Sequence, residues 1–158
     1  MVLATSHRNI REKMKIVVTG GAGFIGSAFI NHLLDNFECD VLCVDKLTYA
    51  GRRENIKHDV SFLHKDICDV TSDELGEFDY IVHFAAESHV DKSILDSTKF
   101  VETNILGTNV LLNAATKYGK TIVLVSTDEV YGSLANGSAT EDNSLHPSSP
   151  YSASKAAI

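Results

Sequence analysis

One ten-residue stretch, VVTGGAGFIG at residues 17–26, constrains the fold of this chain more than any other. An apolar run, Met14–Val18, leads into it and predicts a buried strand, and an amphipathic run, Phe24–Phe37, follows it and predicts a helix. A glycine-rich turn between a strand and a helix is typical of a phosphate-binding loop.

The glycines of this stretch fit two phasings of such a loop. Gly20, Gly23 and Gly26 recur at intervals of three, and Gly21, Gly23 and Gly26 form the pattern G-x-G-x-x-G. Because glycine has no Cβ, the backbone can turn sharply and approach a pyrophosphate, whose charge is stabilised at the helix N-terminus. The alternative is that these glycines serve only a turn.

Asp45 supports the phosphate loop, because it follows Gly26 by nineteen positions, close to the spacing of about 20 expected for a ribose-binding acid. Its carboxylate can accept hydrogen bonds from the adenosine ribose and repels a 2′-phosphate, so the pattern favours NAD over NADP. Lys46, Arg52 and Arg53 lie nearby in the sequence and would soften this preference. The alternative is a carboxylate that simply ends a strand.

The bulk properties narrow the class of protein. At 158 residues, with 44% hydrophobic and 22% charged residues, the chain is expected to form one globular domain with a proper core. Its net charge of −7 argues against binding to nucleic acid or to an anionic membrane surface. No apolar run approaches the roughly 20 residues of a membrane-spanning helix, and no secretory signal is visible. Cys39, Cys43 and Cys68 lack C-x-x-C spacing and are expected to be reduced thiols of a cytoplasmic protein.

Short apolar runs alternate with amphipathic runs after residues 1–13, which are expected to be a ragged or disordered extension, with a basic targeting arm as the alternative. Strands are expected at 14–19, 40–44, 60–64, 78–84 and 121–125, and helices at 24–36 and 96–118. This alternation predicts an α/β fold, a doubly wound parallel sheet forming a Rossmann-like NAD-binding domain over 14–158. The fifth strand is apolar throughout, as expected of a strand covered on both faces.

The end of the chain departs from the alternation. The polar stretch 132–150 is expected to be a loop, and a helix is expected to begin at Tyr151 and to stop after about two turns. We therefore expect the chain to be incomplete.

Polar residues follow the predicted strands at the ends where ligands of open α/β sheets bind. They are the glycines at 20–26, Asp45, Asp66, Ser88, His89 and the segment Ser126–Glu129. Asp66 and Ile67 can contact an adenine, or Asp66 can serve only a turn.

Tyr151 and Lys155 are four residues apart and therefore neighbours on one helix face. A phenol with an ordinary pKa of about 10 is a poor base at neutral pH, and a nearby ammonium group is expected to lower that pKa. The pattern indicates a proton-abstracting tyrosine, with a surface pair as the alternative.

Asp128 and Glu129 are adjacent acids that follow a buried strand. One can serve as an acid and the other as a base if their environments separate their pKa values, and two solvated loop carboxylates are the alternative. The seven histidines show no metal-ligand spacing, so no metal site is expected, and His83 is expected to be structural.

The chain resembles the extended short-chain dehydrogenase/reductases in five segments, TGGAGFIGS (19–27), DKLTYAG (45–51), AAESHVDKS (85–93), STDEVYG (126–132) and SPYSASKAA (149–157). Within that family it is most similar to the dTDP-glucose 4,6-dehydratases. Thr127-Asp128-Glu129 is the discriminating segment, since the related epimerases usually lack paired acids there.

The resemblance implies a dehydration that converts dTDP-glucose to dTDP-4-keto-6-deoxyglucose. Tyr151, assisted by Lys155, would take the proton of the sugar 4-hydroxyl while hydride passes to NAD, and Thr127 would bind that oxygen. Glu129 would remove the C5 proton, Asp128 would protonate the departing 6-hydroxyl, and the hydride would return to C6.

The residues and the resemblance together assign a cofactor set and a substrate set. The cofactor set is Gly20, Gly23, Phe24, Ile25, Gly26, Asp45, Lys46, Leu47, Thr48, Asp66, Ile67, Ala85, Ala86, Ser88, Thr103, Tyr151 and Lys155. His89 and Thr127 are the substrate set.

One departure from the family pattern is large. The sixth strand and the C-terminal substrate domain are absent from this sequence, so the chain alone is expected to be inactive, and the full-length protein is expected to be a homodimer. Two alternatives stay open: another nucleotide-sugar enzyme of the family, such as an epimerase or a decarboxylase, and a non-catalytic NAD-binding module.

Overall fold

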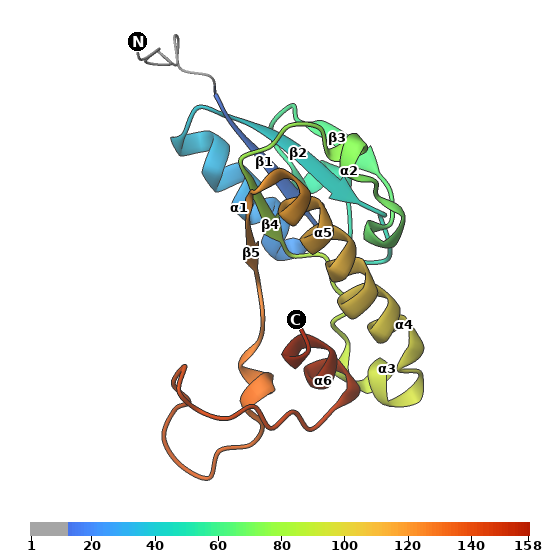
Figure 1. Ribbon diagram of the computed structural model, residues 1–158, viewed down its shortest axis with the longest axis vertical. Coiled ribbons are helices and arrows are strands. Elements are labelled where there is room, and N and C mark those ends of the chain that lie inside the picture. The colour runs from blue at the N-terminus through green and yellow to red at the C-terminus, as the bar shows by residue number, and fades with distance from the viewer. Residues whose placement is uncertain (1–12) are drawn as a thin grey trace, which may run out of the picture.

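A five-stranded parallel sheet of order β3-β2-β1-β4-β5 forms the centre of the structure, a computed structural model that describes residues 13–158 (Figure 1). The strands are β1 (Met14–Thr19), β2 (Cys39–Asp45), β3 (Ser61–His64), β4 (Tyr80–His83) and β5 (Thr121–Leu124). The predicted parallel sheet is therefore confirmed. The expectation for the first residues concerns 1–12, which lie outside the described residues.

Helices connect the strands and extend beyond their carboxyl ends. They are α1 (Phe24–Asn36), α2 (Ser72–Leu75), α3 (Val90–Leu95), α4 (Thr98–Phe100), α5 (Thr108–Tyr118) and α6 (Pro150–Ala156). A π-helical segment, Val101–Gly107, joins α4 to α5, and short 3₁₀ turns span Arg53–Asn55, Ile67–Asp69 and Asp128–Tyr131. Figure 1 shows α3 and α6 side by side beyond the strands, and the predicted polar loop running beside them.

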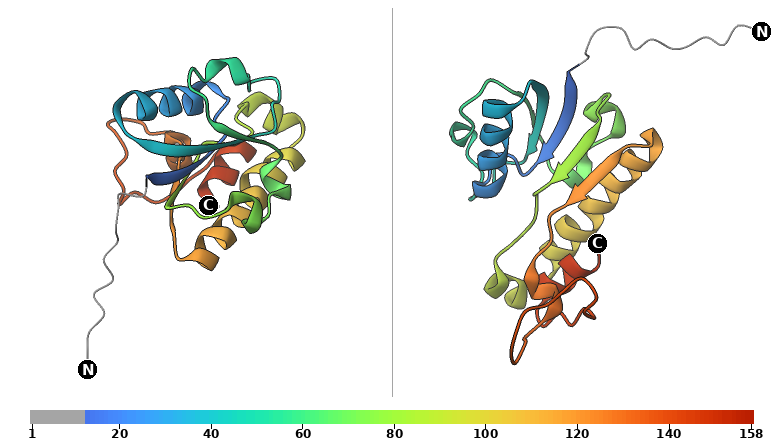
Figure 2. Two further views of the ribbon diagram at one scale, coloured as in Figure 1. Left: turned by 90° about the horizontal axis from the view of Figure 1, so that it is seen from above. Right: turned by 90° about the vertical axis from the view of Figure 1, so that its left-hand side faces the viewer.

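Helices α1 and α5 cover opposite faces of the sheet (Figure 2). Successive side chains of a strand point to opposite faces, so β1 contributes Val17 to the core beneath α5, and Ile16 and Val18 to the core beneath α1. Leu111 of α5 and Ile30 of α1, both fully buried, anchor these two cores. Cys39 and Cys43 are free thiols that pack as small hydrophobic groups beneath α1.

The expectation that β5 is covered on both faces is wrong for the described chain. Ile122 packs against the core beneath α5, whereas Val123, on the other face, is 48% exposed. The reason is that β5 is the edge strand, and α1 packs instead against β1 and β2.

The long helix predicted over 96–118 is present from Thr98 onward but is not α-helical throughout. Its end at Gly119 is confirmed, because this glycine adopts the left-handed conformation with φ of 61° and caps α5. The preceding helix α3 was not predicted, and neither was the π-helical segment, since the apolar spacing does not separate i→i+4 from i→i+5 hydrogen bonding. The π-helical segment buries Thr103, Asn104 and Gly107.

A buried chain of hydrogen bonds runs from β1 through His83 of β4 to the long helix. Thr19 Oγ1 lies 2.6 Å from His83 Nδ1, and His83 Nε2 lies 2.9 Å from Thr108 Oγ1. The Thr108 hydroxyl donates to the carbonyl oxygen of Asn104 at 2.6 Å, so it must accept from His83. His83 is therefore the Nε2–H tautomer, and its Nδ1 accepts from Thr19. The prediction of a structural His83 agrees with this arrangement.

His83 is neutral at physiological pH. Burial lowers its pKa from 6.5 to about 4, with a further contribution from the positive charge of Lys155. A folded-state pKa below the unfolded value stabilises the fold at high pH, and this stabilisation is lost as the pH falls from 6.5 to 4.

We expect acidification over this range to reduce the free energy of unfolding by about 3 kcal/mol through His83. Urea unfolding monitored at several pH values measures the loss, and His83→Gln, which does not titrate there, should lack this step. Long-range ¹H–¹⁵N NMR of the imidazole should show the Nε2–H tautomer at pH 6. An imidazolium signal at that pH would contradict the assignment.

Candidate active site

A cavity of about 340 Å³ opens where the carboxyl ends of the strands meet the long helix and α6. Every residue predicted to bind the cofactor, except Leu47, lines this cavity. These residues are Gly20, Gly23, Phe24, Ile25, Gly26, Asp45, Lys46, Thr48, Asp66, Ile67, Ala85, Ala86, Ser88, Thr103, Tyr151 and Lys155. Residues from all parts of the chain thus converge on one surface, at the point in the sheet order where the crossovers change direction.

The glycine loop between β1 and α1 leaves room only for the backbone. Gly20 has a φ of 67°, and a Cβ on it would lie 2.5 Å from the backbone nitrogen of Ala85. A Cβ on Gly26 would collide with the carbonyl oxygen of Gly20. Gly23 is the N-cap of helix α1 and provides no side-chain cap, and the first turn of the helix has no acidic residue. Its first N–H groups and its dipole therefore suit an anion such as a dinucleotide pyrophosphate.

Asp45 holds the loop after β2 against the glycine loop. Its Oδ2 accepts from the backbone N–H of Ala22 at 3.0 Å, and its Oδ1 accepts from that of Leu47 at 2.8 Å. Each carboxylate oxygen keeps further lone pairs for a ligand hydroxyl. Leu47 has a φ of 52°, the one positive value among the described non-glycine residues, so it shapes the loop rather than lining the cavity.

Asp66 both caps a turn and lines the cavity, so the two roles considered for it coexist. Its Oδ1 accepts from the backbone N–H of Cys68 at 3.1 Å, and its Oδ2 lies 3.0 Å from Lys46 Nζ. Burial alone raises the pKa of Asp66, but the Cys68 N–H and the Lys46 ammonium outweigh it and hold that pKa below its ordinary value. Ile67, which is 3% exposed, lies beside this ion pair.

Lys155 is positioned differently from expectation. It is only 4% exposed, burial lowers its pKa, and its Nζ donates to the carbonyl oxygen of Val125 at 2.6 Å. The pKa of Tyr151 is raised rather than lowered, first by burial and then by the charges of Glu129 and Asp128, against a lowering hydrogen bond from Thr127. In the structure Lys155 thus ties α6 to the end of β5 instead of stabilising the phenolate directly.

Thr127, Asp128 and Glu129 open a 3₁₀ turn directly beyond β5. Thr127 Oγ1 accepts from the backbone N–H of Glu129 at 3.3 Å and lies 3.3 Å from Asp128 Oδ1. Both carboxylates are exposed and act electrostatically on Tyr151, although neither lines the 340 Å³ cavity. His89, predicted to contact substrate, is also exposed and lies outside that cavity.

The residues that hold the tyrosine helix in place were missed by sequence reasoning. The backbone N–H of Tyr151 donates to Ser93 Oγ at 3.2 Å. Asn104 Nδ2 donates to Ser154 Oγ at 2.8 Å and to the carbonyl oxygen of Glu87 at 3.0 Å. Small polar residues without periodicity give no signal of such contacts, because the contacts depend on how α3, the π-helical segment and α6 pack.

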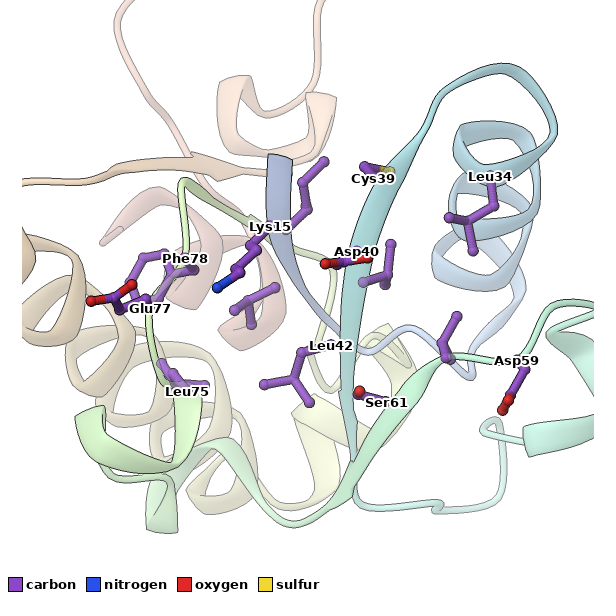
Figure 3. A pocket seen from close by; sticks show the side chains of 14 residues that line it. Lys15, Leu34, Cys39, Asp40, Leu42, Asp59, Ser61, Leu75, Glu77 and Phe78 are labelled. Carbon is purple, nitrogen blue, oxygen red and sulfur yellow. The ribbon is translucent and has the colours of Figure 1, made fainter. Parts of the chain in front are cut away.

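A second cavity, of about 410 Å³, lies at the opposite, amino ends of the strands (Figure 3). Its lining includes Asp40, Asp59 and Glu77 beside Lys15. Three carboxylates against one ammonium group disfavour a phosphate ligand, so the cavity at the carboxyl ends is the better candidate.

Two further findings concern residues 13–158. None of their helices is both long enough and apolar enough to cross a membrane. Their His, Cys, Asp and Glu side chains form no group of three or more that could hold a metal ion.

The parallel sheet, the glycine loop and the cavity at the carboxyl ends of the strands define a Rossmann-like dinucleotide-binding fold. The family model described as GDP-mannose 4,6 dehydratase matches residues 17–158, and the chain belongs to this family of extended short-chain dehydrogenase/reductases.

Curated relatives and solved structures agree with this assignment. The chain is 49% identical to the dTDP-glucose 4,6-dehydratase of Streptomyces antibioticus, over 90% of this chain and 46% of the relative. It is 50% identical, with a TM-score of 0.86, to the structure of the dTDP-glucose 4,6-dehydratase DesIV from Streptomyces venezuelae with NAD bound, over 91% of this chain and 49% of that one. The structure of Thermus thermophilus UDP-glucose 4-epimerase with NAD is 38% identical, with a TM-score of 0.83, over 91% of this chain and 48% of that one. The chain therefore spans about half the length of the relatives it matches.

We expect Asp45→Asn to weaken NAD binding about tenfold and Asp45→Ala to weaken it further, because the first removes the charge and the second also removes both loop-anchoring acceptors. Isothermal titration calorimetry with NAD and NADP measures this effect, and the preference for NAD over NADP should fall in both variants. Asp40→Asn, at the exposed amino end of the same strand, is the matched control. Unchanged NAD affinity in the Asp45 variants would contradict a ribose-binding role.

Proposed function

We propose that the protein to which this chain belongs is an NAD-dependent nucleotide-sugar 4,6-dehydratase that converts dTDP-glucose to dTDP-4-keto-6-deoxyglucose. One observation carries the proposal: the turn that holds Thr127, Asp128 and Glu129 packs against α6, close enough for both carboxylates to raise the pKa of Tyr151, which lines the cofactor cavity. An oxidation at C4 followed by loss of water requires a base for the 4-hydroxyl and a separate acid and base for the elimination.

The residues of the chain divide these tasks by position. Tyr151 takes the proton of the sugar 4-hydroxyl, and Thr127, which lies near enough to the phenol to lower its pKa, binds the same oxygen. The raised pKa of Tyr151 means that its deprotonation needs a positive charge nearby, for which Lys155 and the cofactor are the candidates. Glu129 removes the C5 proton and Asp128 protonates the departing 6-hydroxyl.

The cavity lining fits NAD as the cofactor. The glycine loop and the uncapped start of α1 would hold the pyrophosphate, Asp45 the ribose, and Asp66 with Ile67 the adenine. Bound there, NAD would supply a reversible hydride acceptor, which is regenerated within each turnover. The similar structures that contain NAD support this choice of cofactor.

We further propose that the full-length protein is a homodimer. Large apolar side chains lie exposed along α3 and the long helix, among them Leu95 at 87%, Val101 at 46% and Leu106 at 55%. Exposed apolar surface of this kind is typical of a helix-packing interface.

An epimerase is the second candidate function, because a UDP-glucose 4-epimerase is among the similar structures. Both reactions share the oxidation at C4, so the cofactor cavity and Tyr151 do not separate them. The paired acids at 128 and 129 favour dehydration, since an epimerisation at C4 eliminates no water.

We expect Glu129→Gln in the full-length protein to reduce 4-keto-6-deoxy product formation by a factor of about 10² to 10⁴, because the C5 proton loses its base. Oxidation at C4 should persist, so NADH absorbance at 340 nm should accumulate while product does not. Glu141→Gln, in the exposed loop, is the matched control and should turn over normally. Normal turnover of Glu129→Gln would contradict its role, and epimerised sugar nucleotide from the unmodified protein would contradict the dehydratase proposal.

A further inference from the structure

The loop after β2 has an aromatic side chain at its tip that does not line the cofactor cavity. Its neighbours Thr48 and Ala50 both line that cavity, whereas Tyr49 is 55% exposed and lies on its outer side. A third cavity, of about 820 Å³, adjoins the cofactor cavity there, and the two share Lys46, Thr48, Asp66, Glu87 and Thr103 as lining residues. Tyr49 therefore stands at the border between the two cavities.

Tyr49 contacts the loop after β4 and the first turn of α3 through its aromatic ring. Its ring centroid lies 5.1 Å from that of His89, with an angle of 32° between the rings. Lys92 Nζ lies 4.3 Å from the centre of the Tyr49 ring, within the range of a cation–π interaction. Burial and the charge of Glu87 raise the pKa of the Tyr49 phenol, and the nearby Ser88 side chain lowers it. We call this set of residues (Tyr49, Ser88, His89 and Lys92) the aromatic bridge.

The two loops joined by the aromatic bridge are not neighbours in the sheet. Strand β1 lies between β2 and β4, and the glycine loop follows β1. A contact between the loops after β2 and β4 therefore crosses beyond the strand that carries the glycine loop, beside the part of the cofactor cavity that Thr48, Asp66 and Glu87 line.

The base of the Tyr49 loop is fixed, so the bridge is a property of the folded loop rather than of one mobile side chain. Asp45 binds the N–H of Leu47, Gly51 N–H donates to the carbonyl oxygen of Thr48 at 3.2 Å, and Arg52 N–H donates to that of Ala22 at 3.0 Å. The positive φ of Leu47 is a strained conformation, and the hydrogen bond from its N–H to Asp45 helps to maintain it.

We propose that Tyr49 is a positioning residue that joins the two loops beside the cofactor cavity, orients His89 and slows the release of a bound dinucleotide. The inference rests on the proposed function, in which the cofactor is regenerated within each turnover. Release of NAD is then unnecessary for the reaction, and a contact that slows this release keeps NAD bound between turnovers.

The bridge itself can be tested in the chain without any ligand. In ¹H NMR spectra, the Lys92 ε-methylene protons should be shifted upfield by the Tyr49 ring, and Tyr49→Leu should abolish this shift and move the His89 ring signals. Tyr49→Phe should preserve the shift because it retains the aromatic ring. Phe37→Leu, an equally exposed aromatic position at the far end of α1, should leave both sets of signals unchanged.

Its effect on the ligand is tested by the release of NADH, monitored by stopped-flow fluorescence with excess NAD as the chase. We expect Tyr49→Leu to raise the dissociation rate about tenfold while the association rate changes little, from the typical strengths of aromatic and cation–π contacts. Tyr49→Phe should stay within about twofold of the unmodified chain, and Lys92→Met should give an intermediate rate. The effects of Tyr49→Leu and Lys92→Met should not add, because both break the same contact.

The outcomes separate the bridge from the proposed function. Failure of the unmodified chain to bind NADH overturns the proposed cofactor and the retention role, whereas the NMR shifts still decide whether the bridge exists. NADH binding with equal release from the unmodified chain and Tyr49→Leu overturns the retention role alone. Loss of folding in Tyr49→Leu is detected by the same spectra. In that case, the NADH release rates of Tyr49→Phe and Lys92→Met decide whether the bridge slows release.

Discussion

Polar groups buried between β1, β4 and the long helix must all be hydrogen-bonded, and their pairing holds the candidate site together. His83 accepts from Thr19 and donates to Thr108, while the π-helical segment turns Asn104 toward Glu87 and Ser154. The strand that carries the glycine loop is thereby connected to the helix that carries Tyr151. Only a neutral imidazole completes this chain, because each ring nitrogen has a fixed role as donor or acceptor, and burial keeps the imidazole neutral.

Burial and the neighbouring charges together set the pKa of Tyr151. Burial and the carboxylates of Asp128 and Glu129 raise its pKa, so the described chain holds the phenol protonated. To act as a base near neutral pH, Tyr151 needs a lowered pKa, so a positive charge must come close to the phenol. Lys155 lies on the same helix as Tyr151 and is buried, and its ammonium group is bound to the end of β5, which fixes where its charge lies.

Much of the fold was predictable from local patterns. The glycine loop, the apolar runs and Gly119 depend on backbone geometry and side-chain spacing within a few residues, so the strands, α1 and the end of α5 were expected nearly where they lie. The residues that line the cavity at the strand ends were predictable too, because parallel strands bring their carboxyl ends to one edge. Leu47 was the exception, since its role depends on a backbone angle. The covered fifth strand was wrong, because exposure of an edge strand depends on which helices pack beside it.

The sequence by itself determined the class of fold and the kinds of side chain that surround a dinucleotide site, because both follow from glycine's missing Cβ, from strand periodicity and from the rule that places ligands at strand ends. The tertiary structure alone decided how those side chains are paired. Segments that lie far apart in the chain are joined by the hydrogen bond of Lys155 to Val125, the hydrogen bond of Asn104 to Ser154 and the ring contact between Tyr49 and His89. Such contacts depend on the packing of whole elements, and no local pattern of residues encodes them.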